Sequence, residues 1–227
     1  VVATGPITHT NLKVPMLSSA FASVAATAAG IKAGLKIQGK GDANVVAWAG
    51  DGGTFDIGIQ ALSGAAERHE DIFYFCYDNE AYMNTGIQRS SSTPLFARTT
   101  TTPVGSAGQG KKQNKKDLTE ILVAHNIPYV AQTAPLGNFK DLHTKSHKAI
   151  YTEGPCFLNI LSPCPRGWDY PMAKLAQITK LAVDTCVWPL YEVEEGVWRL
   201  TYIPKKKLPV EDFLRPQGRF RHMFKKG

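Results

Sequence analysis

Apolar runs and helical stripes alternate along most of the chain. Two runs without a polar face, at 44–49 and 72–77, predict strands that are buried on both sides. An apolar stripe at helical spacing over 54–68 predicts the helix that joins them. A further stripe predicts a helix over about 16–37, with Leu17, Phe21, Val24, Ala28, Ile31 and Leu35 on one face.

The alternation resumes after a segment from Asp78 to about Lys115 that has little periodicity. We expect helices at 116–125, 138–153 and about 172–186, strands at 128–132 and 156–162, and a hairpin at 191–202 that turns at Glu195-Gly196. This order predicts an α/β fold, an open, mostly parallel twisted sheet with helices on both faces, followed by a C-terminal hairpin and a basic arm.

Composition agrees with a globular protein. Hydrophobic residues make up 43% of the 227 residues, enough to offset the entropy of ordering a core. The uncharged stretch 14–31 contains a proline, serines and many alanines, so we interpret it as a buried helix and expect no membrane span. The four cysteines show no CxxC spacing, which favours the reducing cytoplasm over a disulfide framework.

The formal net charge is +7, and the positive charge is clustered. The clusters are Lys111–Lys116, Lys205–Lys207 and residues 215–226. Such clusters are consistent with a solvated surface, with nucleic acid or with an acidic protein partner. The chain has no aromatic-interleaved basic motif and no helix-turn-helix signature, so we expect no nucleic-acid partner.

A glycine-rich turn follows the first predicted strand. Gly50, Gly52 and Gly53 let backbone N–H groups approach an anion at the start of a helix, as in a phosphate site. Asp51 would repel a phosphate unless a divalent cation such as Mg²⁺ lies between them. Taken alone, the motif is also consistent with a plain turn in which Asp51 caps the helix.

A second polar loop, DNEAYMNTG at 78–86, follows the next predicted strand. Twenty-seven residues separate Asp51 from Asn79, enough for one helix and one strand, so the two loops should be neighbours. An Asn carbonyl and a backbone carbonyl are oxygen ligands that complete a Mg²⁺ site. The paired pattern resembles the thiamine-diphosphate fingerprint.

The wider sequence resembles the β subunit of the 2-oxoacid:ferredoxin oxidoreductases, especially the pyruvate enzyme. The resemblance covers roughly residues 12–200 and is clearest at residues 50–104, in LSPCPRGW at 161–168 and in AVDTCVWPLYEVEEG at 182–196. It implies oxidative decarboxylation of a 2-oxoacid, pyruvate first of all, to acyl-coenzyme A and CO₂. Electrons would pass through iron–sulfur clusters to ferredoxin in anaerobic metabolism. The chain would be active only with partner subunits (α, γ, δ or fused equivalents).

The resemblance also implies roles for individual residues. Asp51 and Asn79 would be side-chain Mg²⁺ ligands and Ala81 would supply a backbone carbonyl, while Gly50, Gly52 and Gly53 would line the diphosphate. Thr85 would bond a phosphate oxygen, and Asn84 would be catalytic, near the thiazolium and the substrate. We expect a thiamine-diphosphate-binding domain at 1–190 and a hairpin with an extended, subunit-contacting arm at 191–227.

Cys164 would be the fourth ligand of a [4Fe–4S] cluster by the same resemblance. The family's other three ligands lie in an N-terminal CxxC-type segment plus one more cysteine, and this sequence contains none of them. Either the sequence is a fragment or the missing ligands come from residues outside it. Cys76, Cys156 and Cys186 are expected to be small core residues.

Rival interpretations remain open at this point. A different 2-oxoacid, such as oxalate or a branched or aryl oxoacid, fits the same motifs, as does a non-oxidative thiamine-dependent decarboxylase or carboligase. A basic nucleic-acid-binding module is the non-enzymatic alternative. For the basic surface we expect a dock for acidic ferredoxin or partner subunits, formed by Lys111, Lys112, Lys115 and Lys116.

Overall fold

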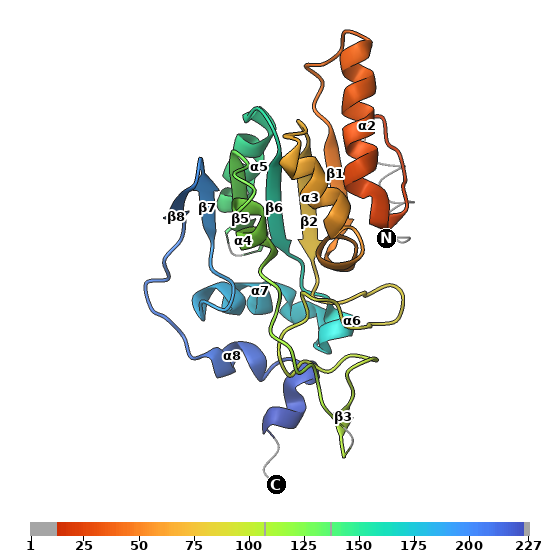
Figure 1. Cartoon of the computed structure of the whole chain (residues 1–227). Coiled ribbons are helices and arrows are strands. Elements are labelled where there is room, and N and C mark those ends of the chain that lie inside the picture. Colours follow the sequence, from red (N-terminus) through yellow and green to blue (C-terminus); the bar gives the residue numbers. More distant parts are fainter. Residues whose placement is uncertain (1–12, 107, 137, 225–227) are drawn as a thin grey trace.

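One mixed sheet organises the chain. A computed structural model of the protein describes residues 13–106, 108–136 and 138–224. Within these ranges the sheet has the order β1-β2-β6-β5-β7-β8 (Figure 1). Its strands are β1 (Val46–Gly50), β2 (Phe73–Asp78), β5 (Tyr129–Thr133), β6 (Cys156–Leu161), β7 (Tyr191–Glu194) and β8 (Val197–Leu200). Strands β1, β2, β6 and β5 are parallel to one another, β7 pairs antiparallel with β5, and β8 pairs antiparallel with β7. This pairing confirms the predicted mostly parallel sheet.

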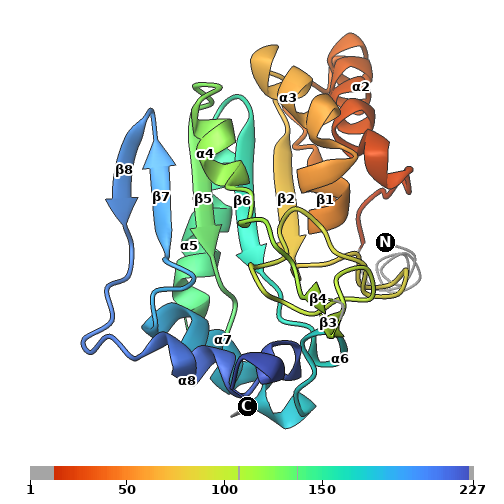
Figure 2. The same ribbon diagram turned by 60° about the horizontal axis from the view of Figure 1, so that its bottom comes forward.

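Helices cover both faces of the sheet, also as predicted. On one face lie α2 (Val24–Ile37), α3 (Ile59–Glu67) and α4 (Leu118–Val123), and on the other α5 (Phe139–Tyr151). A third group, α6 (Pro165–Trp168), α7 (Leu175–Asp184) and α8 (Val210–Leu214), lies beyond the ends toward which the parallel strands run (Figure 2). The short strands β3 (Val104–Gly105) and β4 (Gly108–Gln109) form a separate ribbon.

The core follows from strands that are apolar on both sides. Every residue of β5 and β6 is buried, as a central position in a sheet with two covered faces requires. Two of the flanking helices, α4 and α5, begin at a polar side chain that caps them. Asp117 accepts a hydrogen bond from Glu120 N at the start of α4, and Asn138 accepts one from Asp141 N at the start of α5.

The first helix differs from its prediction. It begins at Val24 after a 3₁₀ turn at Phe21–Ser23, rather than at 16. Its buried residues are Ala25, Ala28, Ala29 and Lys32. Leu17 and Ile31, predicted on the inner stripe, are 68% and 37% exposed. Alanines occupy the inner face of the helix because their short side chains let it approach the equally small Ala47 and Ala49 of β1. No helix in the described part of the chain is long and apolar enough to cross a membrane.

Strand β1 is also less buried than predicted. It lies at the edge of the sheet, and α5 packs over β5 and β6 rather than over β1. Val46 and Trp48 therefore remain 51% and 53% exposed on that face, where the Trp48 ring stacks on Phe75 at 4.2 Å between centroids.

The C-terminal part combines a confirmed hairpin with an arm that is not extended. β7 and β8 turn at Glu195 and Gly196, both with positive φ, as a tight two-residue hairpin requires. The basic segment that follows forms α8 and a 3₁₀ helix at Gly218–Phe224, because Phe213 and Phe220 are apolar enough to be buried (3% and 1% exposed). The division into 1–190 and 191–227 stays a prediction.

Candidate functional site

Two predicted loops meet at the carboxyl edge of the sheet. β1 and β2 are parallel neighbours, with Gly50 opposite Tyr77 in the register. The residues that follow each strand, Asp51 and Asn79, therefore lie side by side. This edge of an open parallel sheet is where ligands commonly bind.

Three oxygen-bearing groups converge there. Asn79 N donates to Asp51 Oδ1 at 3.2 Å. One terminal atom of the Asn79 amide lies 2.7 Å from the carbonyl oxygen of Ala81 and 2.9 Å from Asp51 Oδ1. If that atom is nitrogen, the amide donates to both oxygens; if it is oxygen, three oxygens face one another and a cation is needed between them. Asp51 and Ala81 are 1% and 4% exposed.

The glycines of the first loop are required by close packing. A Cβ on Gly52 would lie 2.4 Å from the Tyr82 ring, and one on Gly53 would lie 3.2 Å from Phe21. The helix predicted over 54–68 begins here as a π-helical turn at Gly52–Asp56, before α3 starts at Ile59. Such π turns occur frequently at functional sites.

A serine-rich stretch of the long loop binds the acids of this edge. Ser90 Oγ donates to Asp51 Oδ2 at 2.5 Å, and Ser92 Oγ lies 2.6 Å from both carboxylate oxygens of Asp78. Thr93 Oγ1 donates to the carbonyl oxygen of Glu80 at 2.6 Å. Sequence reasoning assigned none of these contacts, although the polarity of 90–93 was a usable signal.

Two cations from distant segments balance the buried acids. Lys115 Nζ lies 2.8 Å from Asp78 Oδ2 and 3.0 Å from Glu80 Oε1, and Arg219 Nη2 lies 2.6 Å from Glu80 Oε2. Burial raises the pKa of Glu80, but the charges of Lys115 and Arg219 outweigh burial and hold that pKa below its ordinary value. Burial, followed by the charge of Asp78, raises the pKa of Asp51 well above its ordinary value.

The lysine cluster at 111–116 is less exposed than a docking surface formed by all four lysines would require. Lys111 is 1% exposed, and its Nζ donates to the carbonyl oxygens of Ser91 (3.0 Å) and Thr93 (2.5 Å). Burial lowers the pKa of Lys111 to about 8. Lys116 Nζ donates to Phe55 O, and Lys115 forms the ion pairs described above. Of the four lysines, Lys112 remains exposed.

Asn84 and Thr85 lie on an exposed turn between Tyr82 and Gln88. Thr85 Oγ1 donates to Gln88 Oε1 at 2.5 Å, and Tyr82 N bonds back to Gln88 O at 2.9 Å. Among the described residues, neither Asn84 nor Thr85 hydrogen-bonds to the oxygen cluster. The structure thus brings Asp51, Asn79 and Ala81 together and leaves Asn84 and Thr85 on the adjoining surface.

Cys164 follows β6 at the same edge. It is half-buried and caps α6, where its Sγ accepts from Gly167 N at 3.5 Å. The described residues contain no cluster of three or more His, Cys, Asp or Glu able to hold a metal, so they do not complete a four-thiolate site. Cys76 and Cys156 are buried as predicted. Cys186 is exposed, because it ends α7 with a φ of 59° instead of packing inward.

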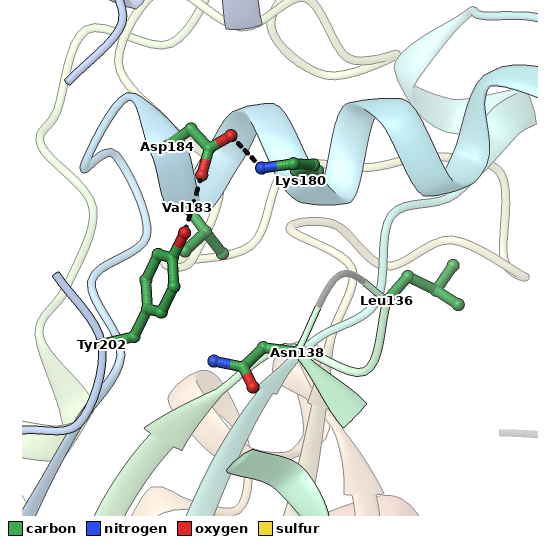
Figure 3. A pocket seen from close by; sticks show the side chains of 6 residues that line it. All are labelled: Leu136, Asn138, Lys180, Val183, Asp184 and Tyr202. Carbon is green, nitrogen blue, oxygen red and sulfur yellow. Dashed lines mark hydrogen bonds and ion pairs between the residues drawn. The ribbon is translucent and has the colours of Figure 1, made fainter. Parts of the chain in front are cut away.

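A hollow between α7, the loop after β5 and the segment after β8 is lined by none of the predicted site residues (Figure 3). Its charged groups pair with one another. Asp184 binds Lys180 and accepts from Tyr202 Oη at 3.4 Å. This hollow therefore offers a ligand little that is not already satisfied.

Comparisons with known proteins agree with the geometry. Residues 8–160 match the family described as thiamine pyrophosphate enzyme, C-terminal TPP binding domain. Pyruvate synthase subunit PorB of Methanocaldococcus jannaschii is 52% identical over 98% of this chain and 76% of its own length. Ketoisovalerate oxidoreductase subunit VorB of Pyrococcus horikoshii is 47% identical over 99% of this chain and 74% of its own length.

Structural similarity supports the fold. A 2-oxoglutarate:ferredoxin oxidoreductase from Magnetococcus marinus aligns with a TM-score of 0.55 and 23% identity, over 71% of this chain and 58% of that chain. The oxidoreductase relatives leave no support for the non-oxidative and nucleic-acid alternatives. The chain belongs to the thiamine-diphosphate-binding β subunits of the 2-oxoacid:ferredoxin oxidoreductases.

Proposed function

We propose that the carboxyl edge of β1 and β2 binds Mg²⁺ and the diphosphate end of thiamine diphosphate. The observation that carries this proposal is that one terminal atom of the Asn79 amide lies 2.7 Å from Ala81 O and 2.9 Å from Asp51 Oδ1. Mg²⁺ holds oxygens at 2.0–2.1 Å in octahedral geometry, which sets neighbouring ligand oxygens about 2.9 Å apart. With oxygen at the terminal position of the Asn79 amide that faces Ala81 O and Asp51 Oδ1, both spacings fit neighbouring Mg²⁺ ligands, so these three residues would hold the ion together with oxygens of the diphosphate.

The surrounding residues take distinct roles in this proposal. Gly50, Gly52 and Gly53 line the diphosphate, and Thr85 bonds a phosphate oxygen. Ser90 orients the Asp51 carboxylate by donating to the oxygen that does not face Asn79. Asn84, on its exposed turn, polarises the substrate carbonyl. When bound, thiamine diphosphate supplies the carbon nucleophile and the electron sink for decarboxylation.

The reaction that we propose is the oxidative decarboxylation of pyruvate to acetyl-coenzyme A and CO₂, with electrons passed to ferredoxin in the cytoplasm. The chain acts as one subunit, together with the other subunits of the oxidoreductase complex. The VorB relative, nearly as similar as the PorB relatives, favours a branched 2-oxoacid as the second candidate. Rates of viologen reduction by the complex with pyruvate and with 3-methyl-2-oxobutanoate decide between the two substrates.

We further propose Cys164 as the ligand that this chain gives to a [4Fe–4S] cluster. Support comes from its place in the loop that follows β6, the strand beside β2. Trp168, four residues on, donates from Nε1 to Asn79 O at 2.8 Å, so the Cys164 helix is attached directly to the proposed Mg²⁺ loop. Since the described residues contain no group of three or more possible metal ligands, the other cluster ligands would come from outside them.

Asp51→Asn should abolish tight binding of the cofactor by the assembled complex. The change removes the anionic Mg²⁺ ligand, and we expect thiamine diphosphate affinity in Mg²⁺ to fall by roughly 100-fold, about 2.7 kcal/mol. Titration calorimetry on the cofactor-stripped complex measures this. Asp42→Asn, at an exposed turn position, is the matched control and should bind like wild type. Equal affinities for the two variants would refute the assignment.

The stabilisation given by Mg²⁺ and thiamine diphosphate should grow as pH rises. The raised pKa of Asp51 means that the metal-free fold prefers the protonated carboxyl, so its stability is lost as pH rises through that pKa. Bound Mg²⁺ instead requires the carboxylate. We expect the melting-temperature difference between loaded and metal-free complex to increase as pH rises above the ordinary pKa of a carboxyl group. A difference independent of pH would contradict this role.

Cys164→Ser should remove one cluster from the assembled complex. Iron content should fall by about four atoms per copy of the β subunit, because a serine oxygen is a poor substitute for a thiolate. Iron analysis together with electron paramagnetic resonance of the reduced complex provides the measurement. Cys186→Ser, at an exposed thiol, should leave iron unchanged. Unchanged iron in Cys164→Ser would return this residue to a purely structural role.

A further inference from the structure

Glu80 lies between the two proposed Mg²⁺ ligands Asn79 and Ala81, in a conformation that an ordinary residue avoids. Its φ is +64°, in the left-handed region, although glutamate has no glycine-like freedom there. This turn lets both Asn79 and Ala81 direct an oxygen to the same point. Such a backbone persists when neighbouring groups over-determine it.

The side chain of Glu80 is what fixes that turn. It is 5% exposed, and each carboxylate oxygen has its own cation, Lys115 Nζ at 3.0 Å and Arg219 Nη2 at 2.6 Å. The backbone on both sides of this side chain is also bonded. Glu80 N donates to Asp78 Oδ1 at 3.0 Å, and Glu80 O accepts from Thr93 Oγ1.

Arg219 reaches this turn from the C-terminal 3₁₀ helix, 139 positions away in the sequence. Its Nε donates to Gln217 Oε1 at 2.8 Å, and its guanidinium lies 3.8 Å over the Trp168 ring. The same indole donates to Asn79 O. The Arg219 guanidinium thus contacts both the Glu80 carboxylate and the Trp168 ring, which hydrogen-bonds to Asn79.

The backbone of Arg219 is anchored independently of its side chain. Its carbonyl oxygen accepts from Arg98 N at 3.0 Å, and the preceding Gly218 N donates to Asp169 O at 2.9 Å. A Cβ on Gly218 would lie 1.9 Å from Asp169 Oδ2, so the close approach of this helix depends on glycine. The backbone that carries the Arg219 side chain is therefore fixed by contacts that do not involve Glu80.

We propose that Arg219 is a positioning residue for the Mg²⁺ site, acting through Glu80 and Trp168. This inference rests on the proposed function of the Asp51, Asn79 and Ala81 cluster. Arg219 does not touch the metal or the cofactor. It fixes the turn that directs Asn79 and Ala81, so that the metal meets a preformed set of oxygens. Groups in this outer position commonly change metal affinity by about 10- to 100-fold when removed.

The test measures Mn²⁺ binding by the assembled, cofactor-stripped complex in the presence of thiamine diphosphate, from the free Mn²⁺ signal in electron paramagnetic resonance. Arg219→Met is expected to weaken Mn²⁺ binding by about 10- to 100-fold. Arg221→Met is the matched control on the same helix. That side chain is 70% exposed and lies 3.6 Å from Asp169, so Mn²⁺ affinity should be unchanged.

Two more variants separate positioning from folding. Arg219→Lys keeps the buried charge but loses the bonds to Gln217 and the stack on Trp168, and it should give a smaller loss of Mn²⁺ affinity. Adding Glu80→Gln to Arg219→Met should cost less than the sum of the two single changes, because both act on one turn. If the Arg219→Met complex does not assemble, the Mn²⁺ affinity of the Arg219→Lys complex decides whether Arg219 is a positioning residue.

The outcomes also distinguish this inference from the proposed function. If Asp51→Asn binds Mn²⁺ as tightly as wild type does, the proposed site itself is wrong. If Asp51→Asn loses binding while both Arg219 variants bind like Arg221→Met, the site stands and the positioning role is overturned. A lower melting temperature in the Arg219 variants with unchanged Mn²⁺ affinity also overturns it.

Discussion

Three carboxylates, Asp51, Asp78 and Glu80, are buried close together at one edge of the sheet, and their repulsion must be balanced by the groups around them. Ionised carboxylates cannot remain buried without cations or hydrogen-bond donors. Lys115 and Arg219 balance Asp78 and Glu80 directly. Among the described residues Asp51 has no such ion pair; the Ser90 hydroxyl and the backbone N–H of Asn79 donate to it instead. A divalent cation at this position would favour the ionised form of Asp51, which burial and the charge of Asp78 disfavour.

The sequence predicts the parts of this arrangement that are local. The glycine turn and Asn79 each follow a strand of strongly apolar residues, and parallel neighbours bring such strand ends together. The meeting of these two loops could therefore be predicted from the sequence. The hydrophobic pattern did not predict which face of α2 is buried, because that face is determined by packing against β1. Alanine displaced Ile31 from the inner face of α2, because the facing strand is itself made of small residues. Periodicity does not reveal what a helix will face.

The other residues of the site could not be predicted from sequence patterns, because they contact residues that are distant in the sequence. Ser90, Lys115 and Arg219 come from segments with no periodic signal, and nothing local distinguishes Arg219 from Arg221. The same holds for the positive charge of the chain. Sequence pattern alone places Lys111 and Lys115 at the surface, yet they hold backbone carbonyls and buried acids. A net charge of +7 therefore overstates the free charge available for docking.

The long-range ion pair between Glu80 and Arg219 has a consequence for the order of folding. Contacts between segments 139 positions apart close a large loop and form late, whereas the β1–α3–β2 unit can assemble from neighbouring residues. The sheet edge and its glycine turn would be native-like before the C-terminal helix docks. Metal binding at the proposed Mg²⁺ site would then report the last step of maturation, and local opening of that helix would weaken this binding without unfolding the sheet.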